Sequence, residues 1–335
     1  MEKIFQKLSL GSASLVFVIL IGIFITLFNA SRPAMEEFGF NFITDPTWNQ
    51  EVQIEIPGSQ KKEPMAQMDS NIIDEDEVLM DDPLLMEEED ELLHSMDEDS
   101  IMADISTKTI FGGWVPIVGT VLSTMIALVF ALPIAMGIAV FLAEIAPKNI
   151  SHVVGIAIEL LAAIPSIIFG MWGLYYFAPI VADVVGGYQV SLLTAGLVLG
   201  VMILPFMAAI TRDSMNTTPD VLKESAYALG ATKFEVIKDI IFPYSKVGII
   251  GSIILALGRA LGETMAVAFL IGSIFQLPGA INDPTVSIPV AMANNFGEAA
   301  GVGESALFYL ALILFLMSFA VIGIAKFVFL KRGSK

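Results

Sequence analysis

The chain has 335 residues, of which 56% are apolar, and a formal net charge of −18 at pH 7. Its mean hydropathy of +0.77 excludes an ordinary water-soluble globular protein and favours a helical membrane protein. No cysteine is present, so no disulfide holds the loops together.

Long uncharged segments predict helices that span a membrane. A hydrocarbon core of about 30 Å requires roughly 20 consecutive apolar residues in a helix. Five uncharged runs lie at residues 10–28, 114–143, 160–182, 184–211 and 305–325. A sixth apolar run, at residues 247–274, is interrupted by the charged residues Arg259 and Glu263. We therefore expect an all-α polytopic protein with six transmembrane helices.

The distribution of lysine and arginine predicts the orientation, because short cytoplasmic loops retain positive charge. With the N-terminus inside, the inner segments hold twelve of the 17 Lys and Arg, and the short outer loops at 183–189 and 273–304 hold none. Both termini are therefore expected in the cytoplasm. No small-x-small cleavage site cleanly follows the first run, so the region 1–30 is expected to be an uncleaved anchor.

The region 31–110 is predicted to be an acidic periplasmic loop. Residues 31–114 carry 22 Asp and Glu against four Lys and Arg, an excess equal to the net charge of the whole protein. Repulsion between like charges opposes packing, so the stretch 51–105 is expected to be largely disordered, either as a solvated tether or as a contact for a partner. His94 is expected at the surface. No metal site is expected, because the acidic residues lack the regular spacing around a glycine that calcium loops show.

Thr120 and Thr124 lie four residues apart in the run 114–143 and so share one helix face. Either their hydroxyls line a translocation pathway for an oxyanion, or they bond to carbonyls of their own helix. Pro133, Pro165 and Pro205 are expected to kink their helices.

The basic segment 211–246 shows the pattern of two short helices joined by a turn. Thr218 is expected to cap the first helix, and Gly230 to end it in the left-handed conformation. Thr232 and Glu235 have the spacing of a capping box for the second helix. The pair would form a rigid protrusion at the membrane surface.

The same segment contains the sequence "ESAYALGATKFEVIKDIIFP" at residues 224–243. It resembles the signature E-A-A-x3-G-x9-I-x-L-P of permease subunits of binding-protein-dependent ABC importers, with Ser225 and Phe242 as the departures. The resemblance implies the type I ABC importer permease fold, with coupling helices at 218–243 that seat in an ATP-hydrolysing subunit. The residues it assigns to this contact are Glu224, Ala226, Gly230 and Pro243.

Arg259 and Glu263 interrupt the run 247–274. Arg259 lies 12 residues after Val247, which is about 18 Å along a helix and near the middle of the membrane. An unpaired arginine at that depth costs about 2.5–3.5 kcal/mol, so Glu263 at i+4 is the expected partner. Either the pair locks helix packing, or the guanidinium is an anion site in the translocation pathway that the carboxylate neutralises until the anion arrives.

Three further segments look like the phosphate-specific ABC permeases, of the C-type rather than the A-type: "GGWVPIVGT" at 112–120, "IELLAAIPSIIFGMWGL" at 158–174 and "GRALGETMA" at 258–266. The likeness covers the chain from Leu10 onward, apart from the acidic stretch, with 111–335 as the permease core. It implies a multi-pass protein of the bacterial inner membrane that moves inorganic phosphate into the cell. The partners it implies are a second homologous permease subunit, two ATPase subunits, a periplasmic phosphate-binding protein and membrane lipid, with no nucleic acid.

This chain is not expected to be an enzyme. It contains no G-x4-G-K-[ST] phosphate loop and no Gly-Lys dipeptide, so ATP and Mg are expected on the partner ATPase, with no cofactor or catalytic residue here. The alternatives are an A-type phosphate permease, a permease for sulfate or molybdate, and an ion-coupled secondary transporter. The last alternative leaves the cytoplasmic signature unexplained.

Overall fold

The computed structural model describes residues 2–55 and 105–331. Contacts divide the chain into a helical unit, residues 1–48 and 111–335, and a second unit, residues 49–110. Most of the second unit, including His94 and the acidic residues 56–104, lies outside the described residues, so the predicted disorder stays a prediction.

The first helix, α1 (Glu2–Phe38), is longer than expected. It continues past residue 30, where Arg32 and Glu36 form an i,i+4 ion pair at 3.3 Å, and the predicted boundary at that point is wrong. Gly39 ends the helix with a positive φ of 55° and donates its N–H to the carbonyl of Met35. One helical turn, α2 (Asn41–Thr44), follows.

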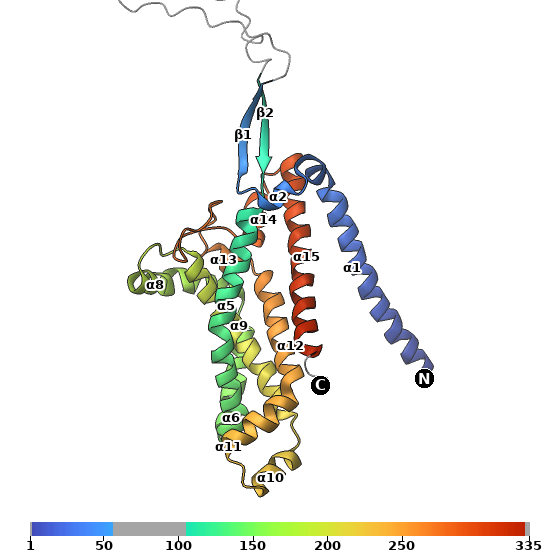
Figure 1. Ribbon diagram of the computed structural model, residues 1–335, viewed down its shortest axis with the longest axis vertical. Helices are drawn as coiled ribbons and strands as arrows, with labels where there is room; N and C mark the ends of the chain where they lie inside the picture. Colours follow the sequence, from blue (N-terminus) through green and yellow to red (C-terminus); the bar gives the residue numbers. More distant parts are fainter. Residues whose placement is uncertain (1, 56–104, 332–335) are drawn as a thin grey trace, which may run out of the picture. The chain divides into compact units, whose positions relative to one another are not determined.

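The last helix, α15 (Val302–Lys331), packs along α1. The rings of Phe24 and Phe315 lie 6.1 Å apart between the two helices. Figure 1 shows α15 between α1 and the remaining helices.

The centre of the helical unit is formed by α5 (Trp114–Val140), α9 (Leu192–Asn216) and α12 (Phe242–Leu261). Small residues repeat every four positions on α5 and are fully buried, at Ala127, Ala131, Ala135 and Ala139. Small side chains allow two helix backbones to approach closely in a membrane. A Cβ added at Gly200 of α9 would lie 3.1 Å from the carbonyl oxygen of Ala127, which shows how close this approach is.

The chain between α5 and α9 forms several short elements rather than one continuous helix. They are η1 (Phe141–Ile145), α6 (Lys148–Ala162), α7 (Ser166–Trp172), η2 (Gly173–Phe177) and α8 (Ala178–Val185). At Pro165 the chain is extended, with ψ of 136°, so this proline separates α6 from α7 where a kink was predicted. Pro133 and Pro205, in contrast, lie inside α5 and α9.

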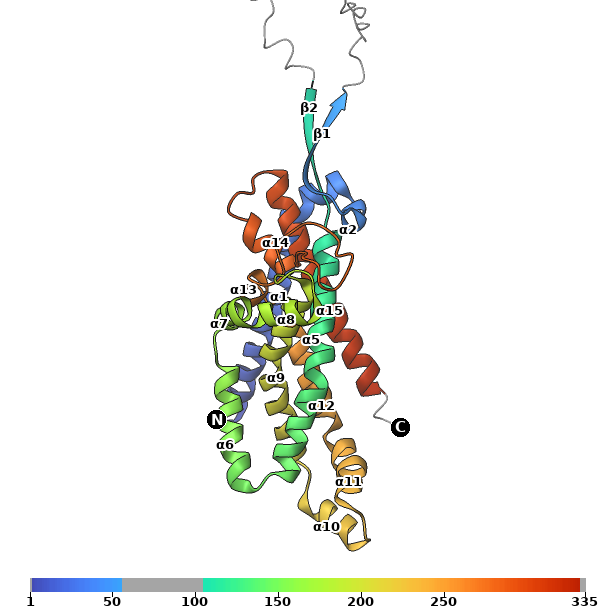
Figure 2. The same ribbon diagram turned by 90° about the vertical axis from the view of Figure 1, so that its left-hand side faces the viewer.

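The cytoplasmic signature falls on α10 (Asp220–Ala228), α11 (Lys233–Glu235) and η3 (Val236–Ile241), which leads directly into α12. Figure 2 shows α10 and α11 at one end of the helical unit.

The fifth span ends earlier than predicted. α12 stops at Leu261, and a short helix, α13 (Met265–Ala268), follows after a break. An irregular segment then leads to α14 (Ile288–Asn295). The expectation of one helix over 247–274 is therefore wrong.

Six described helical segments are long and apolar enough to cross a membrane, as predicted. They are Ile4–Phe38, Trp114–Ile145, Ser166–Val185, Leu192–Asn216, Lys233–Leu261 and Val302–Phe327. The cytoplasmic location of both termini stays a prediction. The all-α prediction needs one correction, because β1 (Trp48–Glu55) and β2 (Ile105–Phe111) pair as a two-stranded sheet.

Candidate functional site

Arg259 lies in the last turn of α12, and its side chain is exposed on the surface of the chain. Its guanidinium carbon lies 5.9 Å from the ring centroid of Phe206, a residue of α9, in a cation–π contact. Among the described residues, no carboxylate forms an ion pair with it. The guanidinium thus forms no ion pair within residues 2–55 and 105–331.

Glu263 is not the partner of Arg259, so the predicted pair is wrong. The helix ends at Leu261, and Gly262 forms its C-cap, so the i+4 relation that would bring the two side chains together is lost. Glu263 instead accepts a hydrogen bond at Oε1 from the backbone N–H of Ala266, at 3.2 Å. It therefore stabilises the start of α13.

The helix α12 ends less than one membrane thickness after its last lysine. From Lys246, the last lysine before the apolar stretch, to Leu261 the helix rises only about 22 Å, which is less than the hydrocarbon core of about 30 Å. Irregular backbone at that depth occurs where it is covered by protein or lines a water-filled cavity. Gly262 is exposed on the chain surface, beside Arg259.

The helix α13 is held in place by α7. A Cβ added at Gly170 of α7 would lie 2.9 Å from the Cα of Ala266, so the two backbones touch and only glycine fits there. This contact fixes the position of the chain immediately after Glu263.

Thr120 and Thr124 do not line a pathway in this conformation, because both side chains are buried. The Thr120 hydroxyl donates to the carbonyl of Pro116 at 2.7 Å and accepts the N–H of Ile288 at 2.8 Å, which ties α5 to α14. The Thr124 hydroxyl has no hydrogen-bond partner among the described residues. Thr120 therefore bonds to a carbonyl of its own helix, which is the structural alternative. Thr124 neither makes such a bond nor lies on the surface.

A second arginine, Arg212 near the end of α9, was not singled out from the sequence. Its side chain is only 12% exposed, and its Nη2 lies 2.9 Å from Glu159 Oε1 of α6 and 2.8 Å from Asp213 Oδ1. Its Nη1 fills the space where a Cβ at Gly155 would lie. Both carboxylates are used by the arginine, so this cluster is a structural tie between α6 and α9.

The coupling hairpin, residues 220–235, has the predicted turn. Gly230 has φ of 87° in the left-handed region, and Thr232 and Glu235 form a capping box, with Glu235 Oε2 accepting the N–H of Thr232 at 2.7 Å. The predicted cap at Thr218 is wrong, because Pro219 occupies the N-cap position and the buried Thr218 hydroxyl makes no hydrogen bond to a described residue.

The hairpin presents an apolar surface around its turn. Leu229 is 90% exposed and Phe234 71%, and Glu224 is exposed on α10. A hollow of about 340 Å³ lies beside them, and its lining includes Ala226, Gly230 and Glu235. Pro243 is exposed in the first turn of α12, and of the four residues assigned to coupling only Ala226 and Gly230 line this hollow.

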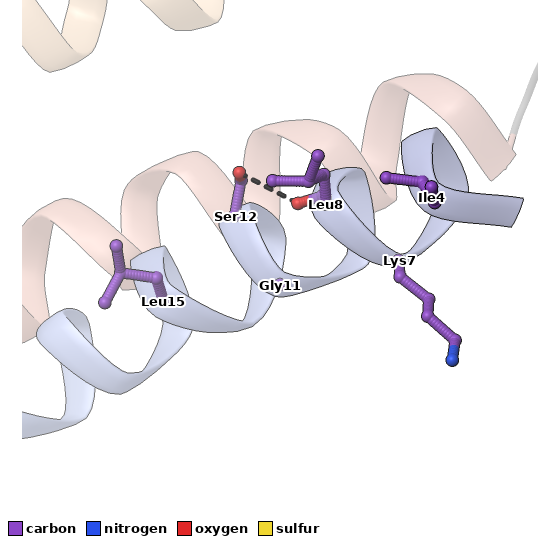
Figure 3. Close-up of a pocket in the computed structure, with 6 residues that line it drawn as sticks. All are labelled: Ile4, Lys7, Leu8, Gly11, Ser12 and Leu15. Atoms are coloured by element: carbon purple, nitrogen blue, oxygen red, sulfur yellow. Dashed lines mark hydrogen bonds between the residues drawn. The ribbon is translucent and has the colours of Figure 1, made fainter. Parts of the chain in front are cut away.

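Another hollow, of about 460 Å³, lies on α1 and is lined by Ile4, Lys7, Leu8, Gly11, Ser12 and Leu15. Figure 3 shows that Lys7 points away from the other side chains and that the Ser12 hydroxyl is used by the carbonyl of Leu8. The one charged residue of the lining, Lys7, is thus turned away from the other side chains of the hollow.

Residues 132–332 match the family model of the binding-protein-dependent transport system inner membrane component. The phosphate transport system permease protein PstC of Pasteurella multocida is 46% identical over 245 residues, which cover 67% of this chain and 77% of that protein. PstC of Mesorhizobium japonicum is 35% identical over 355 aligned positions, covering 100% of this chain and 91% of the relative.

Among solved structures, a chain of the inward-facing MetNI methionine ABC transporter matches 64% of this chain and 93% of its own length, with a TM-score of 0.46 and 22% identity. From the family model and the relatives, the chain belongs to the binding-protein-dependent transport system inner membrane components and, within them, to the phosphate transport system permease proteins, as a multi-pass protein of the bacterial inner membrane.

Proposed function

We propose that this chain is the permease subunit of an ATP-driven importer that carries inorganic phosphate into the cell, and that Arg259 contacts the anion during passage. The observation that carries the proposal is the exposed guanidinium at the broken end of α12, with no carboxylate of the described chain paired to it. A cation held at membrane depth without an internal partner is a site that an anion can satisfy.

The chemistry of the side chain favours a tetrahedral oxyanion. A guanidinium presents a planar fork of N–H donors that can bond two oxygens of phosphate at once. Sulfate and molybdate share this geometry, so Arg259 alone does not choose among them. The relatives named above are phosphate transport permeases, and this supports phosphate as the cargo.

Glu263 has a separate role in this proposal. It caps α13 and so keeps the chain beside Arg259 in one conformation. Its negative charge also lies four residues from the arginine along the chain, where it lowers the positive potential without closing the site. We infer that this balance allows an anion to bind and to leave.

The coupling hairpin supports the need for an ATPase partner. Leu229 and Phe234 expose apolar surface of the kind that a partner protein covers. The left-handed Gly230 fixes the turn between them. We infer that Glu224, Ala226 and Gly230 contact an ATPase subunit there, with Pro243 marking the start of the helix that leads to Arg259. Thr120 and Thr124 are left out of the pathway.

The full complex in this proposal contains a second homologous permease, two ATPase subunits that hold ATP and Mg, and a periplasmic phosphate-binding protein, in membrane lipid. This chain would bind no cofactor. Rocking of the two permeases, driven by the ATPases, would expose Arg259 first to the outside and then to the cytoplasm.

Reconstitution of the complex in liposomes tests the proposal. We expect ATP-dependent uptake of labelled phosphate that greatly exceeds uptake of labelled sulfate or molybdate. Equal uptake of another oxyanion would reject phosphate as the specific cargo. Uptake by this chain alone, driven by an ion gradient without ATPase, would reject the importer assignment and favour a secondary transporter.

A further inference from the structure

Besides its contacts with η3, the helix α10 is held by one short ion pair. Lys223 Nζ lies 2.6 Å from Glu144 Oε1, and the two side chains are only 16% and 10% exposed. Asp220 lies farther away, at 3.9 Å from the same ammonium, and is itself exposed. None of the residues of α10 is fully buried, and Ala226 packs only at the edge of the apolar cluster formed with η3 and the end of α5.

Glu144 belongs to the end of one of the three central helices. It lies in η1, which continues α5 without a break, so that one span covers Trp114–Ile145. The ion pair therefore joins α10 to α5 across 79 positions of the sequence.

The other two central helices reach the coupling hairpin through the chain itself. α9 ends at Asn216, shortly before α10 begins, and η3 runs directly into α12. α5 has no such connection. Its end also touches η3 in an apolar cluster that contains Ala139, Val236 and Ile237.

The two kinds of contact respond differently to movement. Apolar contacts are non-directional, so helices joined by them can slide. A short, charged hydrogen bond between shielded groups fixes both distance and direction, and separating its partners leaves each charge poorly solvated. A displacement of α10 is therefore followed by Glu144 and with it by α5.

We propose that the Lys223–Glu144 ion pair transmits the movement of the coupling helix α10 to α5 during the transport cycle. This proposal rests on the proposed function, because it requires that an ATPase moves the hairpin. It assigns Lys223 and Glu144 as positioning residues that touch neither the anion nor ATP. Without the pair, α5 would follow the hairpin only through its apolar packing against α9, α12 and η3.

The test uses the complete complex in liposomes and measures phosphate uptake per ATP hydrolysed. Glu144→Gln keeps the size of the side chain and removes its charge, and Lys223→Met removes the ammonium. We expect each variant to assemble, to hydrolyse ATP within about twofold of the wild-type rate, and to lose at least about fivefold in uptake per ATP. The exchange Lys223→Glu with Glu144→Lys should restore the ratio to within about twofold.

Lys238→Met is the matched control, because Lys238 lies in the same cytoplasmic segment, is well exposed and has its nearest carboxylate, Asp239, only at 4.0 Å. It should leave the ratio unchanged. A wild-type ratio in Glu144→Gln, no rescue by the exchange, or an equal loss in the control would each overturn the proposal. Failure of Glu144→Gln to assemble would also overturn it, since the pair would then serve assembly.

The wild-type arm separates this proposal from the one on which it rests. If the unmodified complex imports sulfate rather than phosphate, the proposed substrate fails, and the ratio is measured with sulfate. If the unmodified complex imports nothing with ATP, the proposed function fails before any variant is compared.

Discussion

Arg212 and Arg259 lie near the ends of two neighbouring helices, α9 and α12, and their surroundings differ completely. Arg212 is almost buried and is bonded to two carboxylates. Arg259 is exposed, and its guanidinium lies over the ring of Phe206. The first arginine is paired with carboxylates of this chain, whereas no carboxylate of the described residues forms an ion pair with the second.

The comparison shows that the position of an arginine within a span does not by itself reveal its role. What distinguishes the two is whether the chain supplies carboxylates at hydrogen-bonding distance. A satisfied charge stabilises the packing of helices, and an unsatisfied one at membrane depth is costly unless it serves binding.

The largest effect is expected at Arg259, where Arg259→Gln should reduce phosphate uptake about ten- to hundredfold. A hydrogen bond to a charged group contributes about 1.5–3 kcal/mol, and 1.4 kcal/mol corresponds to a factor of ten. Uptake by Arg259→Lys should lie between that of the wild type and that of Arg259→Gln, because lysine keeps the charge but lacks the planar fork of N–H donors. Uptake in liposomes at equal amounts of assembled complex is the measurement. Normal uptake by both variants would contradict the claim that Arg259 binds the anion, and neither arginine would then have a role in binding.

The next effect concerns stability at Arg212. Arg212→Gln leaves Glu159 and Asp213 without their partner and should destabilise the chain by about 1–3 kcal/mol. The loss is smaller than for a fully buried ion pair, because water solvates both carboxylates, which are more than half exposed. A thermal unfolding curve in detergent should shift to lower temperature, while uptake per assembled complex stays near the wild-type value. An uptake loss as large as that of Arg259→Gln, without loss of stability, would erase the contrast.

Glu263 gives a smaller effect that separates the cap from the rejected ion pair. Glu263→Ala removes the acceptor for the N–H of Ala266, and loss of such a cap costs about 0.5–2 kcal/mol. Glu263→Gln keeps an acceptor and should lose less uptake than Glu263→Ala. A loss with Glu263→Gln as large as that with Glu263→Ala would show that the negative charge matters more than the cap.

The smallest effects are expected at the two buried threonines of α5. Thr120→Val leaves the N–H of Ile288 without its acceptor and should cost about 1 kcal/mol of stability. Thr124→Val replaces an unpaired hydroxyl by a methyl group of similar size and should be neutral or slightly stabilising. Uptake per assembled complex should not change in either variant, and a selective loss of uptake would return these residues to the pathway.

Most features set by local sequence were predicted correctly, and the cap at Thr218 is the exception. Hydropathy found all six spans, and spacing found the left-handed Gly230 and the capping box at Thr232. These features depend on residues within one or two turns of each other, so a short stretch of sequence contains the needed information.

Features that depend on distant parts of the chain were missed. The end of α12 could not be predicted, because the apolar composition continues beyond Leu261. The separate helix α13 packs against Gly170, a residue that is distant in the sequence. The role of Arg212 depends on Glu159, 53 positions earlier, and Glu144 is 79 positions before Lys223. Burial of Thr120 depends on α14, which follows it by 168 positions.

The most direct test of the central claim is whether the site beside Arg259 is open to water and to phosphate. The chain has no cysteine, so a single Gly262→Cys can be labelled selectively, and a side chain has room there because its nearest neighbour would be 3.8 Å away. Ala256→Cys, fully buried on the same helix, is the control. In the assembled transporter, we predict that a charged thiol reagent modifies the cysteine at 262 but not the one at 256, and that phosphate slows the reaction while chloride does not. Lack of modification at 262, or modification that phosphate leaves unchanged, would contradict the account.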